Sequence, residues 1–220
     1  KLAEAMVNIG ELAGRKTVAV LTEMDEPLGC AVGNSLEVIE AIETLKGRGP
    51  KDFIELCTYF VTEILMVCGV CENQINAKAL VMEKINNGDG LDKLAKMIKW
   101  QNGNENVIND YSLLGNSKEI IEVQYLGKDS VFVEKVDAMM IGEAAMLLGA
   151  GRETKDQSVD HTVGIVLNKK IGDKVFQNDV IAYVHTNGKN TGKAIEMIHK
   201  AYQFNNNEVI KKSKIIKVVR

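Results

Sequence analysis

The sequence predicts an α/β fold: most of a mixed α/β lobe with many helices, plus an appended C-terminal α+β region of barrel-sandwich-like shape. Apolar residues recur at a helical period from about residue 52 to residue 97. Residues 17–22 are an aliphatic and β-branched run, which is typical of a strand buried on both faces of a parallel sheet. Beyond residue 115 the chain becomes β-rich. We therefore expect two domains, residues 1–115 and residues 116–220.

The first part is expected to be a helix, the strand, a loop and a series of helices. After the loop, Asn34 should cap a helix with Glu37 as its capping-box partner, and that helix should stop at Gly47. The following helices should break at residues 86–90, where asparagine and glycine cluster, and residues 101–106 form a polar linker.

The second part should mix strands with two helices, over residues 142–148 and 191–204. The turn at residues 172–175 resembles those of biotinyl and lipoyl carrier domains, but the lysine that such carriers modify is missing. Runs of β-branched and aliphatic residues predict strands at residues 119–123, 129–136, 163–167, 180–184 and 215–219.

The composition limits the possible partners. Twenty-seven basic and 30 acidic residues give a net charge of −3, which argues against a nucleic-acid or anionic-membrane partner. The longest apolar stretch, residues 64–71, is far shorter than the ~20 residues of a membrane span. Four cysteines are too few for a disulfide scaffold, so we expect a cytoplasmic protein with reduced thiols. Because the chain starts at Lys1 in a helical pattern, we expect a fragment of a longer protein.

No catalytic residue can be assigned from the local motifs. Cys68 and Cys71 have no second cysteine pair to complete a zinc site, and we expect two buried thiols. His161, His185 and His199 are scattered, and no local signature of a nucleophile accompanies them.

The loop and helix from Leu28 to Glu40 could form a cation site. A glycine-rich turn leaves carbonyl oxygens unpaired, and a carboxylate from the next helix could join them. Such a site has low charge and suits an alkali or alkaline-earth ion. The alternative is that Glu40 lies on a solvated helix face.

A second glycine-led loop contains Gly149, Gly151 and Arg152. It is not a dinucleotide-binding fingerprint, because the third glycine is missing and a helix precedes it. It is either a mobile loop whose arginine could bind a phosphate or carboxylate, or a helix C-cap followed by a surface turn.

Two segments are similar to pyrimidine-nucleoside and thymidine phosphorylases. Residues 19–43 contain Met-Asp-Glu-Pro-Leu-Gly-Cys-Ala-Val-Gly-Asn-Ser-Leu-Glu-Val-Ile-Glu-Ala, which resembles the family's M-x-x-P-L-G-x-A-x-G-N-x-L-E-V-x-E-A. Residues 144–152, Ala-Ala-Met-Leu-Leu-Gly-Ala-Gly-Arg, resemble its C-terminal domain, as do Val159-Asp160, Val163-Gly-Ile165 and Gly172-Asp-Lys-Val175 further on. The resemblance spans nearly the whole chain and is weakest over residues 98–128.

The resemblance implies an enzyme of pyrimidine salvage, a pentosyltransferase that converts a pyrimidine nucleoside and phosphate to free base and pentose 1-phosphate. The family's phosphate loop and base-binding residues lie in its N-terminal half, and we find neither motif in this sequence. It therefore implies the C-terminal portion of such an enzyme, without catalytic residues and inactive alone. The parent is expected to be a homodimer without an organic cofactor.

The resemblance also assigns roles to individual residues. The family's potassium-type cation site uses two backbone carbonyls and one carboxylate that correspond to Leu28, Ala31 and Glu40, which is half of its ligand set. The loop from Gly149 to Glu153 corresponds to one that orders when the cleft closes.

Two alternatives stay open. The chain could be a non-catalytic binding or scaffold module derived from this family, or part of a related phosphoribosyltransferase such as anthranilate phosphoribosyltransferase. The second is disfavoured because the Gly-Ala-Gly-Arg and Gly-Asp-Lys-Val segments resemble the phosphorylases.

Overall fold

The computed structural model describes residues 1–152 and 154–220. The helices are α1 (Leu2–Leu12), α2 (Asn34–Leu45), α3 (Lys51–Val67), α4 (Gln74–Asn86), α5 (Asp89–Trp100), α6 (Ala138–Leu148) and α7 (Thr191–Ala201), with 3₁₀ turns η1 (Glu105–Ile108) and η2 (Tyr111–Leu114). The strands are β1 (Ala19–Thr22), β2 (Ala31–Val32), β3 (Glu119–Gln124), β4 (Val131–Val136), β5 (Gly164–Leu167), β6 (Lys174–Val175), β7 (Val180–Thr186), β8 (Tyr202–Asn205) and β9 (Ile215–Val219).

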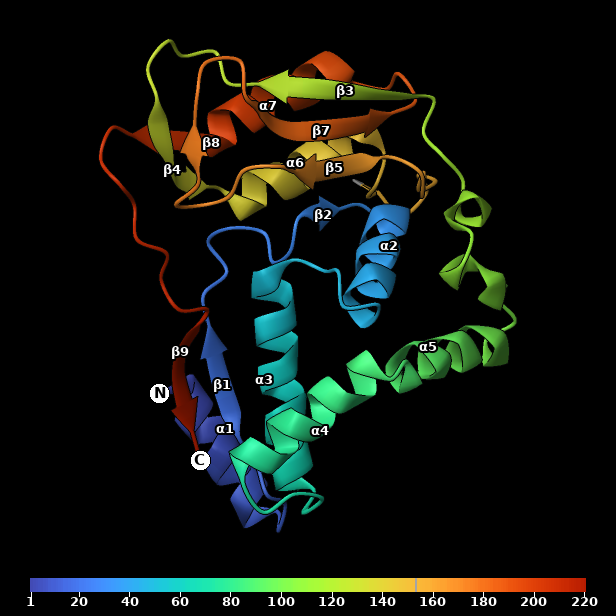
Figure 1. Cartoon of the computed structure of the whole chain (residues 1–220), viewed down its shortest axis with the longest axis vertical. Coiled ribbons are helices and arrows are strands. Elements are labelled where there is room, and N and C mark those ends of the chain that lie inside the picture. The colour runs from blue at the N-terminus through green and yellow to red at the C-terminus, as the bar shows by residue number, and fades with distance from the viewer. Residues whose placement is uncertain (153) are drawn as a thin grey trace.

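The described strands form three antiparallel sheets, with the strand orders β2-β5-β7-β3, β6-β4-β8 and β1-β9. The first two sheets, with α6 and α7, form one end of the molecule, and α1, β1, β9 and both termini lie at the other end (Figure 1). A helix-rich region with an appended α+β region is confirmed.

The setting predicted for the first strand is wrong. β1 pairs with β9 in antiparallel register, from Ala19 opposite Val219 to Thr22 opposite Ile215. Its residues are half-buried, and Leu21 is exposed. An aliphatic run cannot by itself distinguish a parallel sheet from a two-stranded ribbon, because both tolerate apolar side chains on each face.

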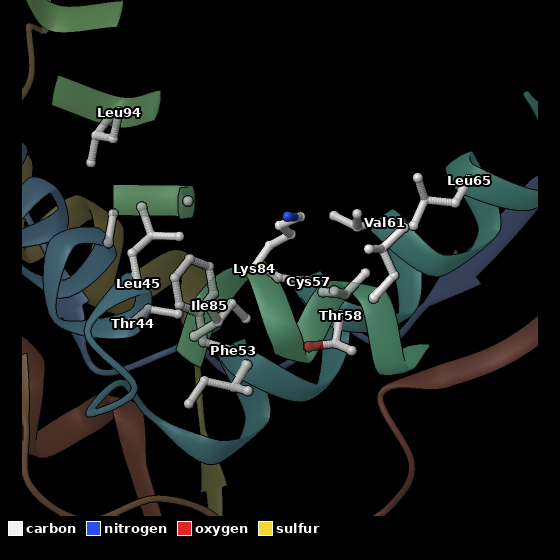
Figure 2. A pocket seen from close by; sticks show the side chains of 15 residues that line it. Thr44, Leu45, Phe53, Cys57, Thr58, Val61, Leu65, Lys84, Ile85 and Leu94 are labelled. Atoms are coloured by element: carbon white, nitrogen blue, oxygen red, sulfur yellow. The ribbon is translucent and has the colours of Figure 1, made fainter. Parts of the chain in front are cut away.

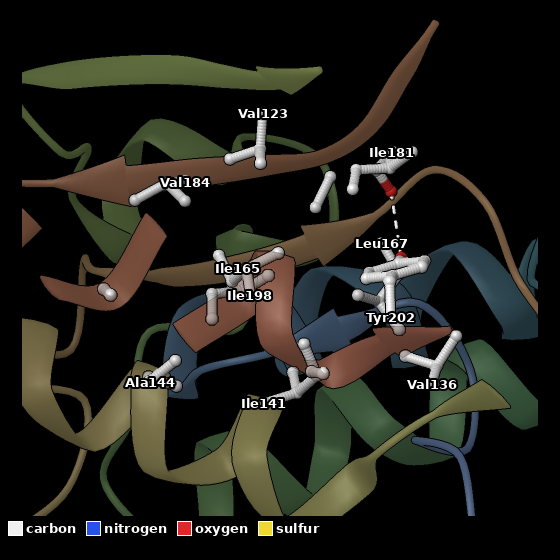
Figure 3. Packing of buried hydrophobic residues seen from close by; sticks show 14 of the residues in the cluster. Val123, Val136, Ile141, Ala144, Ile165, Leu167, Ile181, Val184, Ile198 and Tyr202 are labelled. Atoms are coloured by element: carbon white, nitrogen blue, oxygen red, sulfur yellow. Dashed lines mark hydrogen bonds between the residues drawn. The ribbon is translucent and has the colours of Figure 1, made fainter. Parts of the chain in front are cut away.

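The main hydrophobic core lies in the β-rich end. Valine, isoleucine, leucine and alanine side chains from β3–β7 pack against the inner faces of α6 and α7 (Figure 3). Tyr202 of β8 is 5% exposed, and its hydroxyl donates to the carbonyls of Lys169 and Ile181 at 2.8 and 3.0 Å. Both hydrogen bonds satisfy a phenol that would otherwise be costly to bury.

Two strand pairs join residues on opposite sides of position 115. One is β1 with β9, and the other is β2 with β5. The second pair requires glycine, because a Cβ on Gly164 would lie 2.4 Å from the Val32 carbonyl oxygen. The division into residues 1–115 and 116–220 stays a prediction.

Several element boundaries differ from those predicted. α6 begins at Ala138, because the Asp137 side chain caps it by accepting the Met140 N–H. Residues 202–205 form β8 instead of the end of a helix, and Tyr202 and Phe204 stack with ring centroids 5.9 Å apart. β2 was not predicted, since a two-residue strand has no period to detect.

The two cysteines expected to be buried are not. α3 ends at Val67, so Cys68 is exposed at the C-cap and Cys71 is half-buried in the turn toward α4. The apolar pattern that suggested burial runs past the last helical turn.

Candidate functional site

The loop from residue 23 to residue 30 is held at its start by buried charges. Glu26 is 6% exposed, and its carboxylate accepts the Ile171 N–H at 3.1 Å and pairs with Lys214 at 2.9 Å. Lys214 also pairs with Glu23 at 2.8 Å. Burial disfavours the charged ammonium, but the two carboxylates more than offset this and raise the pKa of Lys214.

Glu40 folds back from α2 onto the end of this loop. Its Oε2 accepts the N–H groups of Cys30 and Ala31 at 2.8 and 3.1 Å. Oε1 lies against Gly29, where a Cβ would come within 2.2 Å of it. Gly29 also has a left-handed φ of +71°, a conformation that favours glycine. Glu40 is therefore bound to the loop, and the alternative of a solvated helix face is wrong.

Burial is the main influence on this carboxylate. It raises the pKa of Glu40, and the two N–H groups lower the pKa only in part. A half-buried anion beside a loop with backbone carbonyls is a donor set that fits a monovalent cation. Leu28 is half-buried and Ala31 is buried on that same loop. Ala31 thus contacts the Glu40 carboxylate directly, and the role of Leu28, Ala31 and Glu40 as ion ligands stays a prediction.

Lys170 is a part of this site that the sequence did not reveal. It is 8% exposed, and its ammonium donates to the carbonyls of Pro27 and Gly29 at 2.7 and 2.8 Å and to the Asp52 carboxylate. Burial alone would raise the pKa of Asp52, but the hydrogen bond and charge of Lys170 lower it below its ordinary value. Lys170 comes from the turn between β5 and β6, so distant parts of the chain meet at this loop.

Burial also controls the thiol at this place. The pKa of Cys30 is raised to about 11, chiefly by burial and secondarily by the neighbouring carboxylates, against the opposing charge of Lys170. The raised pKa disfavours the thiolate, which is the nucleophilic form of cysteine.

The predicted closure loop lies beside the beginning of α2. Gly149 is the C-cap of α6 and has a left-handed conformation. The Asn34 side chain donates to the Ala150 carbonyl at 2.8 Å. Gly151 is half-buried and Arg152 is exposed, whereas Glu153 lies outside the described residues. The two segments singled out in the sequence therefore touch.

This contact also changes the capping predicted for α2. Gly33, not Asn34, is the N-cap. Glu37 does cap the start of the helix, because its carboxylate accepts the N–H of the N-cap residue Gly33 at 3.0 Å. The Asn34 side chain is therefore free to bind Ala150, and the Ser35 N–H donates to the His161 carbonyl at 3.0 Å. A cavity of about 160 Å³ lies between the start of α2 and α6.

A separate apolar groove of about 620 Å³ lies among α2, α3, α4 and α5 (Figure 2). Phe53, Cys57 and Val61 of α3 and Ile85 of α4 are among the side chains that line it. Thr58 also lines it, and its hydroxyl is buried without a hydrogen-bond partner among the described residues. The groove is lined almost entirely by carbon, so it suits an apolar protein surface better than a charged substrate.

The described residues contain no group of three or more histidine, cysteine, aspartate and glutamate side chains placed to hold a metal ion. Within the same residues, no helix has the length and apolar character needed to cross a membrane.

Comparison with known proteins confirms the resemblance. Residues 132–205 match the family described as pyrimidine nucleoside phosphorylase C-terminal domain. The pyrimidine-nucleoside phosphorylase of Staphylococcus aureus strain USA300 is 42% identical over 197 residues, which cover 90% of this chain and 45% of the relative. The protein of the same name from the bovine strain RF122 / ET3-1 is 41% identical over the same shares. The chain thus spans about half the length of the curated relatives that it matches.

Proposed function

We propose that this chain, similar over 90% of its length to pyrimidine-nucleoside phosphorylases, forms the C-terminal part of an enzyme that catalyses phosphorolysis of pyrimidine nucleosides. The reaction joins phosphate to the anomeric carbon of the pentose and releases the free base. Phosphate and pyrimidine nucleoside are the substrates of the whole enzyme, a cytoplasmic homodimer without an organic cofactor.

One observation carries this proposal. The two segments with the strongest resemblance to these enzymes, residues 19–43 and residues 144–152, are more than a hundred positions apart, yet the Asn34 side chain donates to the Ala150 carbonyl at 2.8 Å. The fold therefore assembles both of them into one place. This supports a shared role in one site better than it supports two unrelated surface loops.

The first role that we propose is to hold a monovalent cation. Leu28 and Ala31 would supply carbonyl oxygens and Glu40 its carboxylate. When bound, the ion supplies a positive charge that orders the phosphate-binding loop of the other half of the enzyme. Glu40 is already fixed by the N–H groups of Cys30 and Ala31, so little conformational freedom would be lost on binding.

The second role is closure over the substrates. Gly149 has a left-handed φ of 114°, and Gly151 gives further freedom to the chain that carries the exposed Arg152. A guanidinium matches the geometry of a phosphate with paired N–H donors. Closure would exclude water, so that phosphate and not water reaches the anomeric carbon.

The phosphate and base sites are then formed by the part of the relatives that this chain does not span. Alone, the 220 residues should not consume nucleoside. The test is a fusion of this chain to the unmatched N-terminal part of the Staphylococcus aureus phosphorylase. We expect the fusion to consume uridine or thymidine only when phosphate is present, and to release base and pentose 1-phosphate.

The control is the isolated chain at the same concentration, which should be inert. A fusion that unfolds cooperatively but leaves both nucleosides intact would contradict the proposal and favour a non-catalytic module. Consumption without phosphate would contradict phosphorolysis.

A further inference from the structure

Lys170 is bound in the same way as a free monovalent cation would be. Its ammonium has three N–H donors, and three acceptors surround it: the carbonyls of Pro27 and Gly29, at 2.7 and 2.8 Å, and the Asp52 carboxylate. Every donor is thereby used. Two loop carbonyls and one carboxylate are also the type of donor set expected for an alkali ion on this loop.

The backbone holds Lys170 in this position. Its N–H donates to the Asp173 carboxylate at 2.8 Å, and its carbonyl accepts the Asp173 N–H at 2.9 Å. This tight turn fixes the backbone from which the Lys170 side chain extends to the loop. Lys170 is only 8% exposed, so little water can compete with these acceptors for its ammonium.

We propose that Lys170 is a covalently attached cation that orders the loop bearing the cation half-site, independently of any bound ion. Lys170 acts through the loop and is a positioning residue. The inference depends on the described contacts of this chain and not on the proposed phosphorolysis. Lys170 binds the carbonyls of Pro27 and Gly29, whereas Leu28, Ala31 and Glu40 are the ligands proposed for the ion, so the two cations would use different groups of one loop.

Removing the ammonium should create a cation site that did not exist before. Lys170→Ala leaves two carbonyls and the Asp52 carboxylate without a partner. A buried ion pair that loses one member is destabilised strongly, which corresponds to a fall in melting temperature of about 6 °C or more for a chain of this size. A cavity of about 220 Å³ opens beside Lys170, Cys30 and Asp52, so a small amine can reach the vacated place.

The experiment measures thermal unfolding of the whole chain at constant ionic strength with different cations. The substitution removes three carbons and the ammonium, which are the atoms of n-propylammonium. We expect n-propylammonium chloride to restore the melting temperature of Lys170→Ala in a saturable way, and potassium to restore it in part. Tetramethylammonium has the charge but no N–H donor and should not restore it.

The matched control is Lys169→Ala. Lys169 is the preceding residue and also binds a carbonyl and a carboxylate, those of Lys174 and Asp179, but its side chain is 22% exposed, against 10% for Lys170. It should lose little stability and show no response to propylammonium. Equal melting temperatures for the two variants would overturn the proposal, as would rescue by tetramethylammonium to the same extent.

A measurement on the unaltered chain covers the case in which Lys170→Ala does not fold. A buried ammonium with three acceptors should give an Nζ signal in ¹⁵N-detected NMR that exchanges slowly with water. We expect one such signal to vanish in Lys170→Arg while the signals of other lysines remain. If no slowly exchanging ammonium is assigned to Lys170, the proposal fails.

Discussion

The Glu40 carboxylate accepts the backbone N–H of Cys30 at 2.8 Å, and the same oxygen accepts the N–H of Ala31 at 3.1 Å. Helix α2 is thereby bound to the loop that precedes it, through a side chain ten positions away. The bond also leaves the second carboxylate oxygen beside Gly29, facing the loop. The contribution of the Glu40 charge to stability can therefore be measured separately from that of its hydrogen bonds.

We expect Glu40→Ala to lower the free energy of unfolding by about 1–3 kcal/mol, because two partly buried N–H groups lose their acceptor. Glu40→Gln should stay within about 1 kcal/mol of the parent, since one amide oxygen can accept both N–H groups. Urea unfolding at neutral pH measures both. If Glu40→Gln is as damaging as Glu40→Ala, the hydrogen bonds are not what Glu40 contributes.

The pH dependence of the stability contributed by Glu40 follows from its raised pKa. A carboxyl group whose pKa is higher in the folded state stabilises the fold when protonated. That contribution is full below its ordinary pKa of 4.5 and is lost as the pH rises through the raised value. Glu40→Gln should remove this dependence. Potassium, relative to tetramethylammonium, should stabilise the parent but not this variant, if Glu40 helps to bind the ion.

Gly29→Ala should lower the free energy of unfolding more than Gly47→Ala does. Gly29 and Gly47 both have left-handed φ angles, +71° and +79°, so alanine is strained by about 1–2 kcal/mol at either position. A Cβ at Gly47 meets no atom within 4 Å, whereas at Gly29 it lies 2.2 Å from the Glu40 carboxylate. The difference between the two variants therefore isolates the displacement of Glu40. Equal losses of stability would show that Glu40 moves aside without cost.

Acid unfolding should depend on Glu43. Hydrogen bonds from Arg48 and Tyr111 lower the pKa of Glu43 to about 2. A carboxyl group with a lowered pKa stabilises the fold above its ordinary pKa of 4.5, and this contribution is lost as the pH falls toward 2. Glu43→Gln should therefore flatten the stability profile between these pH values.

Glu143→Gln, at an exposed position on α6, is the control for this measurement. It should leave the profile unchanged. If Glu43→Gln loses as much stability at acid pH as the parent does, the contacts of Glu43 with Arg48 and Tyr111 do not persist in solution.

The sequence was sufficient for those parts of the site that are local. The loop with Leu28 and Ala31 and the helix with Glu40 are adjacent in the chain, so their spacing and their resemblance could indicate a shared site. Lys170 could not be found in this way. It reaches Asp52 across 118 positions, and a lysine in a polar turn has no pattern that distinguishes a buried ammonium from a solvated one.

The wrong or missing predictions of secondary structure have similar causes. β8 continues the apolar spacing of α7, so the helical period hid the change to a strand at Tyr202. β2 is defined by its pairing with β5, and its two residues have no signal without that partner. Propensity and periodicity are local, whereas these elements are set by tertiary contacts.

Cys57 and Cys68 can be used to test which face of the chain is covered in the fusion described above. Cys57 lines the apolar groove and Cys68 is exposed outside it. Because the chain spans 45% of its relatives, we expect the unmatched part of the phosphorylase to cover the groove in the fusion described above. An apolar groove of about 620 Å³ is costly to leave in water.

Alkylation by iodoacetamide, followed by mass spectrometry of the cysteine peptides, tests this prediction. Burial raises the pKa of Cys57, so it should react more slowly than Cys68 even in the isolated chain. In the fusion, the reaction of Cys57 should slow by a further factor of roughly ten or more, while that of Cys68 is unchanged. An unchanged rate at Cys57 in a folded fusion would show that the groove stays open. Protection that grows with the concentration of the isolated chain would instead identify a second copy as its occupant, because only self-association depends on that concentration.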